Sequence, residues 1–119
     1  MPLRFGHIEL FVKDPSRSKQ FYRDVLSFEV VAEQGPDHVW LKSGDVEILL
    51  RRAPQDQASA ASYQRSSAGL VLYTDDLLAT LESLAAHGLT PSGDDGSAKC
   101  PTFVDPDGHW IQIVNPKEH

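Results

Sequence analysis

HIELFVKD, residues 7–14, alternates apolar and polar side chains and ends in Asp, which is the pattern of a half-buried strand. The same pattern returns as GLVLYTD, residues 69–75. The closing residues, Asp14 and Asp75, lie 61 positions apart, and the glycines of two later turns lie 64 apart. Similar offsets across different elements indicate a duplicated unit. Such a repeat is the first feature to consider in assigning the fold.

Each copy reads as β-α-β-β-β. In the first copy, Asp14 suits a helix cap and Pro15 suits the first helical position. The elements predicted there are a helix over 15–26 and strands over 5–12, 28–32, 38–42 and 46–51. The second copy is predicted to hold a helix over 76–87, a loop-rich stretch over 90–101, and strands over 69–74, 102–105 and 109–115. The fold class is therefore α+β.

The chain of 119 residues has the length of one domain. We expect module one at 1–52, a polar linker at 53–67 whose one large side chain is Tyr63, and module two at 68–119. Each half is small for an independent core, so the modules are expected to share one, within a chain or across two. A homodimer is predicted.

Composition excludes several classes of function. The net charge of −6 argues against nucleic-acid binding, because phosphate contacts need a concentrated basic surface. No apolar run reaches the length of a membrane span, and the first residues lack a signal-peptide pattern. The single cysteine, Cys100, cannot form an internal disulfide and is interpreted as an ordinary loop or strand residue. These features favour a cytoplasmic location.

Three motifs resemble the vicinal oxygen chelate superfamily, which includes glyoxalase I, extradiol dioxygenases and bleomycin-resistance proteins. They are HIEL at 7–10, FYRDVLSF at 21–28 and DPDGH at 105–109. Ser27 stands where the family usually has Gly. The resemblance covers nearly the whole chain and implies two β-α-β-β-β modules that form a half-open barrel around a concave cavity. It implies no single function, because the fold hosts many chemistries.

The resemblance also implies where a metal would bind, since members take ligands from the first and last strands of their modules. His7 matches the first position. The second module offers Gly69, which has no donor, and Gln112, where active members usually have Glu. The remaining position is either Glu47 or Leu49, and we favour Leu49. We expect no cofactor; the alternative is a divalent ion such as Zn, Ni, Mn or Fe on His7, Glu47 and Gln112.

Strand parity brings nine aromatic, charged and polar side chains to one concave face. The residues predicted to bind a ligand are His7, Glu9, Phe11, Trp40, Glu47, Arg51, Tyr73, Trp110 and Gln112. Such a mixture is typical of a small-molecule pocket. The two acids and one Arg favour a planar or amphoteric ligand with cationic groups. The same parity also fits a solvated sheet face or a dimer contact.

The predicted function is small-molecule binding, without a metal, by a protein of the glyoxalase/bleomycin-resistance fold. The alternative is a divalent-metal-dependent lyase, isomerase or dioxygenase, in which the ion would polarise a substrate with adjacent oxygens. A third possibility is a metal-free enzyme that works through His7 and Glu9. The sequence assigns no catalytic residue.

Overall fold

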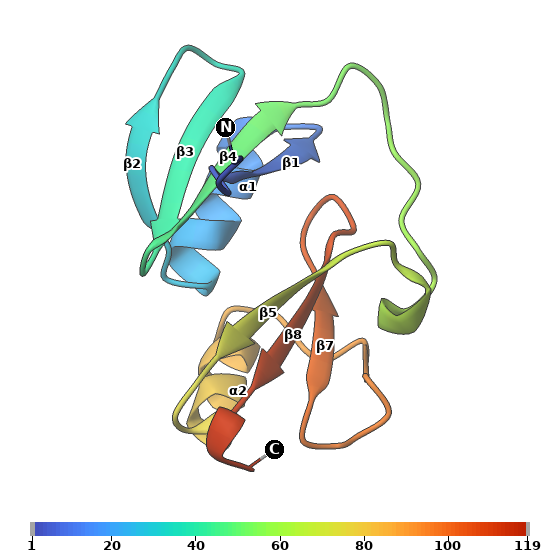
Figure 1. The fold of residues 1–119 in the computed structure, drawn as a ribbon. Helices are drawn as coiled ribbons and strands as arrows, with labels where there is room; N and C mark the ends of the chain where they lie inside the picture. The colour runs from blue at the N-terminus through green and yellow to red at the C-terminus, as the bar shows by residue number, and fades with distance from the viewer. Residues whose placement is uncertain (1, 119) are drawn as a thin grey trace. The chain divides into compact units, whose positions relative to one another are not determined.

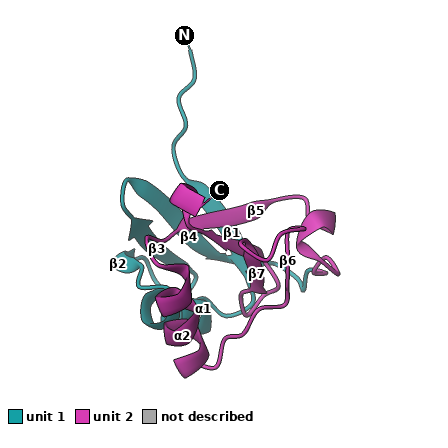
Figure 2. Ribbon diagram, turned by 90° about the horizontal axis from the view of Figure 1, so that it is seen from below, with its two compact units in different colours: residues 1–57 teal, residues 58–119 magenta. Residues whose placement is uncertain are grey.

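The computed structural model describes residues 2–118, and the chain divides into two compact units, residues 1–57 and 58–119 (Figures 1 and 2). Both units have the order β-α-β-β-β along the chain. Each contains a four-stranded sheet that is open at both edges. The α+β class and the duplicated unit expected from the sequence are confirmed.

The first unit orders its strands β1-β4-β3-β2. Its elements are β1 (Ile8–Val12), α1 (Pro15–Gln20), η1 (Phe21–Val25), β2 (Glu29–Glu33), β3 (His38–Ser43) and β4 (Val46–Arg52). β1 and β4 run parallel, while β3 is antiparallel to both of its neighbours. This arrangement places β1 and β4 side by side although they are separated by most of the unit in sequence.

The second unit repeats this order as β5-β8-β7-β6. Its elements are η2 (Tyr63–Arg65), β5 (Gly69–Tyr73), α2 (Leu77–Ala86), β6 (Gly93–Asp94), β7 (Pro101–Val104), β8 (Trp110–Val114) and η3 (Pro116–Glu118). β5 and β8 are again parallel, and β7 is antiparallel to β6 and β8. Within the stretch 90–101, predicted to be loop-rich, β6 is only two residues long and β7 begins at Pro101.

Helix capping explains where both helices begin. The Asp14 carboxylate accepts the Ser16 and Arg17 N–H groups at 3.0 and 3.3 Å, and Pro15 follows it as the first helical residue. In the second unit the cap is Asp76, whose carboxylate accepts the Ala79 N–H at 3.0 Å.

The first helical segment ends differently from the prediction. Residues 15–26 do not form one α-helix: a π-helical turn, η1, follows α1, and the Leu26 N–H donates to the Phe21 carbonyl, five residues earlier, at 3.4 Å. Ser27 then adopts a φ of +63°. A left-handed residue at this turn explains why Gly is the residue expected there, since Gly carries no Cβ to oppose that conformation.

One face of each sheet is apolar and buried. In the first unit Leu10, Val12, Val39, Ile48 and Leu50 lie on this face, with α1 packed against β3 and β4. In the second unit the register gives the corresponding face to Phe103, Ile111 and Ile113. The opposite, open faces hold the polar and aromatic residues that the sequence singled out. No helix among residues 2–118 is long and apolar enough to cross a membrane.

Candidate functional site

Three ionisable side chains meet on the open face of the first sheet. Arg51 Nη1 donates to Glu9 Oε1 at 2.9 Å, and His7 Nε2 lies 3.1 Å from Glu9 Oε2. Both carboxylate oxygens of Glu9 are therefore bound. Strand geometry explains the meeting, because His7 and Glu9 are two residues apart and Phe11, two further on, lies opposite Arg51 in the β1–β4 register. The side chains of His7 and Glu9 remain 32% and 31% exposed, so a ligand can reach them.

Trp40 extends this cluster across the sheet. Its ring meets the His7 ring edge-on, with centroids 4.6 Å apart at 65°. The indole N–H donates to Gln34 Oε1 at 3.1 Å, which fixes the ring's orientation. Sequence reasoning missed Gln34, because it lies just beyond β2 in a turn. We call His7, Glu9, Trp40 and Arg51 the sheet-one cluster.

Charge is largely neutralised on this face. Arg51, and then His7, hold the pKa of Glu9 below its ordinary value by hydrogen bonding to its carboxylate. Glu47 lies opposite Lys42 in the β3–β4 register, so it too has a cationic neighbour. The expectation of a ligand with cationic groups was based on two acids and one Arg, and the structure pairs that Arg, Arg51, with Glu9.

The register bears on the choice between Glu47 and Leu49. Leu49 lies opposite Glu9 and is buried, whereas Glu47 lies near the hairpin turn and is exposed. In the second unit, Gln112 lies opposite Val71, two residues after Gly69, as Glu9 lies two residues after His7. Leu49 and Gln112 thus hold equivalent places, which favours Leu49 as the residue at the family position.

In the second unit, residues 58–66 cover the sheet face that carries Trp110 and Gln112. We call residues 58–66 the strap. Tyr63 Oη donates to Gln112 Oε1 at 3.1 Å, and a Cβ added at Gly69 would lie 2.6 Å from the same Tyr63 oxygen. The Tyr63 ring therefore lies directly over Gly69. Gln112 Nε2 donates to Asp95 Oδ2 at 2.5 Å, so both ends of the Gln112 amide are engaged within this unit.

Further contacts hold the strap along its length. The Trp110 indole N–H donates to the Ala60 carbonyl at 3.0 Å, and Ser59 Oγ donates to the Gly108 carbonyl at 2.8 Å. Beyond Tyr63, Gln64 Nε2 donates to the Asp94 carbonyl at 3.0 Å. Trp110 and Gln112 are each only 6% exposed as a result. A ligand could reach them only if the strap moved.

Each unit holds its own share of the predicted ligand-binding residues. Trp40, His7, Glu9 and Arg51 come together, and Phe11 lies beside Arg51 in register, 38% exposed. Trp110 and Gln112 lie beneath the strap. Glu47 is exposed on β4, two residues before Leu49, and Tyr73 is 75% exposed at the end of β5. The sequence signals for the strap were present in Tyr63, the one large side chain of the linker-like stretch, and in Gly69.

Burial shifts the pKa values of two further groups that contact Gln112. It raises the pKa of the Tyr63 phenol, and the Asp95 carboxylate adds to this effect. Burial also raises the pKa of the Cys100 thiol, again with a contribution from Asp95. A neutral, fully buried thiol is a poor nucleophile, which agrees with the interpretation of Cys100 as an ordinary residue.

The donor set does not fit a divalent ion. Of the four family positions, Leu49 and Gly69 have no donor, and Gln112 is uncharged with both ends of its amide hydrogen-bonded. His7 is the one intact ligand, and its Nε2 contacts Glu9. Residues 2–118 contain no group of three or more His, Cys, Asp or Glu side chains that could hold an ion. Protein zinc sites use at least three such ligands.

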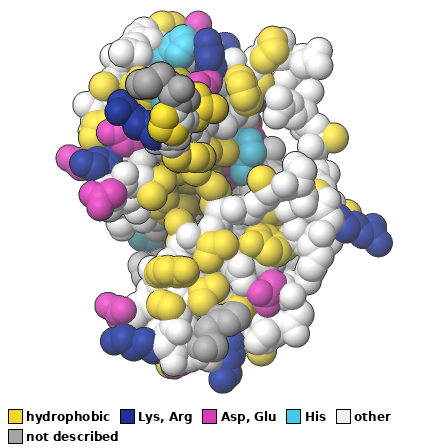
Figure 3. Space-filling model, in the orientation of Figure 1, with side chains coloured by type: hydrophobic (Ala, Val, Ile, Leu, Met, Phe, Trp, Pro, Cys, Tyr) yellow, Lys and Arg dark blue, Asp and Glu magenta, His cyan; other side chains and the backbone are white. Residues whose placement is uncertain are grey.

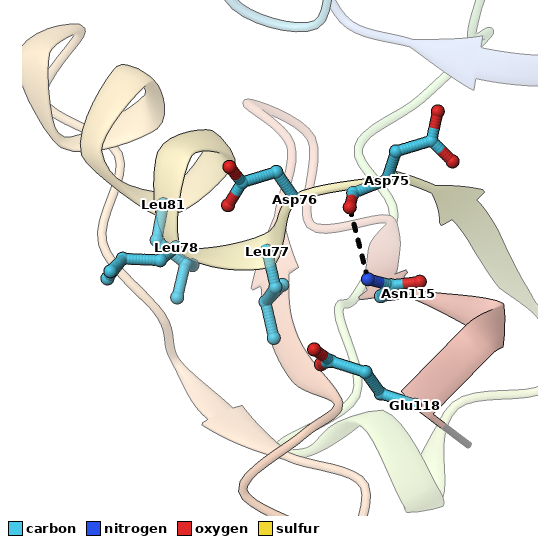
Figure 4. Close-up of a pocket in the computed structure, with 7 residues that line it drawn as sticks. All are labelled: Asp75, Asp76, Leu77, Leu78, Leu81, Asn115 and Glu118. Carbon is cyan, nitrogen blue, oxygen red and sulfur yellow. Dashed lines mark hydrogen bonds between the residues drawn. The ribbon is translucent and has the colours of Figure 1, made fainter.

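A cavity of about 440 Å³ lies in the second unit at the start of α2 (Figure 4). Its lining comes from α2, η3 and the residues that precede them: Asp75, Asp76, Leu77, Leu78, Leu81, Asn115 and Glu118. The Asn115 side-chain N–H donates to the Asp75 carbonyl at 3.2 Å. None of these residues belongs to the predicted ligand-binding set.

Comparison with known proteins identifies the family of this chain. Residues 4–113 match the profile of the Glyoxalase/Bleomycin resistance protein/Dioxygenase superfamily. The uncharacterized protein YetH of Bacillus subtilis (strain 168) is 24% identical over 111 residues, which cover 89% of this chain and 92% of YetH.

Two solved structures show the same fold at lower identity. Lactoylglutathione lyase from Agrobacterium tumefaciens superposes with a TM-score of 0.71 at 22% identity, covering 98% of this chain and 96% of the lyase. The fosfomycin resistance protein FosX of Listeria monocytogenes gives 0.74 at 16% identity, covering 96% and 92%. Because these likenesses are below 25% identity, they concern the fold alone. The chain belongs to the Glyoxalase/Bleomycin resistance protein/Dioxygenase superfamily.

Proposed function

We propose that this protein binds a small molecule at the sheet-one cluster and does so without a resident metal. The observation that carries the proposal is the convergence of His7, Glu9, Trp40 and Arg51 on an exposed sheet face through two hydrogen-bonded contacts and a ring contact. A purely solvated face gives no reason for an aromatic ring to be held in place by neighbouring side chains. Pre-positioned aromatic and charged groups are the usual components of a ligand site.

The chemistry of the cluster favours a planar ligand with an anionic or acceptor group. Trp40 offers a ring surface for stacking. The guanidinium of Arg51 has five N–H donors, and one of its nitrogens serves Glu9. Since Arg51 already pairs with Glu9, an added carboxylate on the ligand meets little repulsion.

A ligand screen with matched pairs tests this proposal. Naphthalene-2-carboxylate and 2-naphthylmethylamine share a ring and differ in charge. Each is titrated into protein freed of metal by EDTA, with Trp110 replaced by Phe so that Trp40 is the remaining tryptophan reporter. We expect the carboxylate to quench Trp40 fluorescence at lower concentration than the amine.

Two variants test whether the quenching of Trp40 comes from binding at the sheet-one cluster. Arg51→Met should weaken carboxylate binding by about tenfold, since a hydrogen bond to a charged group contributes about 1.5–3 kcal/mol. Arg52→Met is the matched control, because Arg52 is the next residue in β4, bonds to Asp37 and lies on the other face of the sheet. Equal binding by both ligands, or equal loss in both variants, would contradict the assignment of the site.

The competing proposal is a divalent-metal-dependent lyase, isomerase or dioxygenase, and His7 is the observation that favours it. Among the structures with a similar fold, one is named as a lactoylglutathione lyase, which belongs to this class of enzyme. A metal there would act as a Lewis acid. The residues at the other family positions do not supply its ligands, so the metal-free function is preferred.

A further inference from the structure

The open face of the first sheet carries a histidine that the sheet-one cluster does not include. His38 is the first residue of β3 and lies directly opposite Arg51 in the antiparallel β3–β4 register. Opposite residues of such a pair share one face of the sheet, with Cβ atoms about 4.5–5.5 Å apart. Trp40, two residues further along β3, lies on the same face. His38 therefore belongs to the face on which a ligand is proposed to bind.

The register arranges this face in rows of side chains that cross the strands. Arg51 and His38 form one row, and Leu49 and Trp40 form the next. Successive rows on one face are about 6.5–7 Å apart, because they lie two residues apart along each strand. A planar ligand that stacks on Trp40 can therefore extend an acidic group into the row of Arg51 and His38.

Both side chains of this row have donors to offer. Arg51 Nη1 donates to Glu9, whereas Nε and Nη2 of Arg51 take part in no hydrogen bond among the described residues. The ring of His38 likewise takes part in no hydrogen bond, ion pair or ring contact within residues 2–118. The Arg51 side chain is 47% exposed and His38 is partly exposed, so a ligand can reach both.

The acidic side chains near His38 already have other cationic neighbours. The nearby ion pairs are Arg51 with Glu9, Arg52 with Asp37, and Lys19 with Glu33. The other titratable groups of this face are His7, which contacts Glu9, and a further row in which Lys42 lies between Glu29 and Glu47. Figure 3 shows a histidine side chain against a Lys or Arg side chain at the surface of the first unit. A negative charge that pairs with His38 must therefore come from a ligand.

We infer that His38 and Arg51 together form the anion-binding end of the sheet-one site, and that His38 holds the acidic group of the ligand as its imidazolium. This inference rests on the proposed function, because it concerns the same site. Trp40 stacks on the planar part of the ligand, while Arg51 and His38 each donate to its carboxylate.

A histidine at this place makes binding depend on pH in the physiological range. The side chain of histidine ordinarily gains its proton near pH 6.5. A bound anion favours the protonated form of a neighbouring imidazole, so binding transfers a fraction of a proton from the solvent to the ring of His38. An acidic ligand is therefore held more tightly at low pH and released as pH rises.

Calorimetry with naphthalene-2-carboxylate tests the inference. The probe is titrated into EDTA-treated protein at about pH 6 and about pH 8, a range in which its carboxyl group stays ionised and an ordinary histidine changes charge. We expect the affinity to be higher at the lower pH by up to about fivefold, the size of an exposed ion pair. Titrations at neutral pH in two buffers of different ionisation enthalpy should show that a fraction of a proton is taken up.

Variants identify the group that takes up the proton. His38→Gln should bind the probe equally at both pH values and take up no proton. His38→Lys, which stays charged throughout, should restore the tighter binding at about pH 8. His7→Gln should keep the proton uptake. The matched control is His87→Gln, which changes a histidine at the end of α2 in the second unit and should also keep it.

The outcomes separate this inference from the proposed function. If Arg51→Met weakens binding of the probe while His38→Gln keeps the pH dependence and the proton uptake, the assignment of His38 is wrong and the proposed site stands. Loss of the uptake in His7→Gln, with its retention in His38→Gln, would assign the proton to His7 and also overturn the inference. If the wild-type protein binds no probe, or if Arg51→Met has no effect, the proposed function and this inference both fail.

Discussion

A methyl group at residue 69 should destabilise the protein when Tyr63 is present and stabilise it when Tyr63 is absent. In the wild-type protein a Cβ at Gly69 would lie 2.6 Å from Tyr63 Oη and 2.7 and 2.8 Å from two ring carbons. The ring is the free end of its side chain, so it can swing aside. The cost of Gly69→Ala is then the cost of moving Tyr63 away.

The magnitude follows from the contact that is lost. When Tyr63 leaves, Gln112 Oε1 loses its donor at a residue that is only 6% exposed. An unsatisfied buried acceptor costs about 1–3 kcal/mol. Replacing Gly by Ala inside a strand returns about 0.5–1 kcal/mol. The expected net change in the free energy of unfolding is a loss of about 1 kcal/mol for Gly69→Ala alone.

The sign reverses in a Tyr63→Ala background. With the ring removed, the Cβ has room, and only the gain of about 0.5–1 kcal/mol remains. The coupling energy between positions 63 and 69 should therefore be about 1–3 kcal/mol, within the range found for residues in contact. Tyr63→Phe separates the two effects, because it keeps the ring over Gly69 while removing the hydrogen bond to Gln112.

Urea unfolding followed by circular dichroism measures all four members of this cycle. Gly6→Ala is the control for the substitution itself, because a Cβ at Gly6 meets no atom within 4 Å. If Gly69→Ala has the same effect with and without Tyr63, then the phenol does not lie over residue 69 in solution and the account of the strap is wrong.

Four further outcomes are expected. Arg51→Gln should raise the pKa of Glu9 toward its ordinary value, as read from the carboxyl carbon shift in an NMR titration, because Arg51 is the main cause of the lowering; an unchanged value would refute the ion pair. Since folding raises the pKa of Tyr63, the wild-type protein should lose stability as pH rises above about 10, through the higher folded-state value, and Tyr63→Phe should lose less over the same window. Cys100 should react with a thiol reagent only after unfolding, because the side chain is buried and its pKa is raised; rapid labelling of the native protein would contradict this. Ser27→Gly should stabilise the protein by up to about 1 kcal/mol in thermal denaturation, because the residue at this turn has a φ of +63°; a loss of stability would show that the Ser27 side chain does more than occupy the turn.

The fold was accessible from sequence because two periodic signals agreed. The alternation in β1 and β5, followed in both copies by an Asp cap, fixes a β-α start, and the later hairpins complete each unit. The predicted ends of helices and strands were less accurate where the local sequence pattern did not mark an end. Alternation continues back to Phe5, but the pairing of β1 with β4 begins at Ile8. The π-helical turn η1 depends on the backbone conformation near Ser27, which the spacing of apolar residues does not indicate.

Parity identified the residues of each open face but not their accessibility. It assigned Trp40 and Trp110 to one predicted site, although Trp40 is partly exposed and Trp110 is covered. The difference comes from the strap, a polar segment without periodicity whose position depends on single side chains. Parity also counted the charge of Glu9 without the neutralising contact to Arg51, which a strand pattern cannot supply.

Metal content tests the central claim most directly. The protein should be purified without a histidine tag or chelator, incubated with zinc, nickel, manganese and iron in turn, dialysed, and examined by elemental analysis. The account predicts far less than one ion per chain for every metal, because Leu49, Gly69 and Gln112 do not complete a site with His7. One ion per chain that is lost in both His7→Ala and Gln112→Ala would contradict the account and establish the metal-dependent alternative.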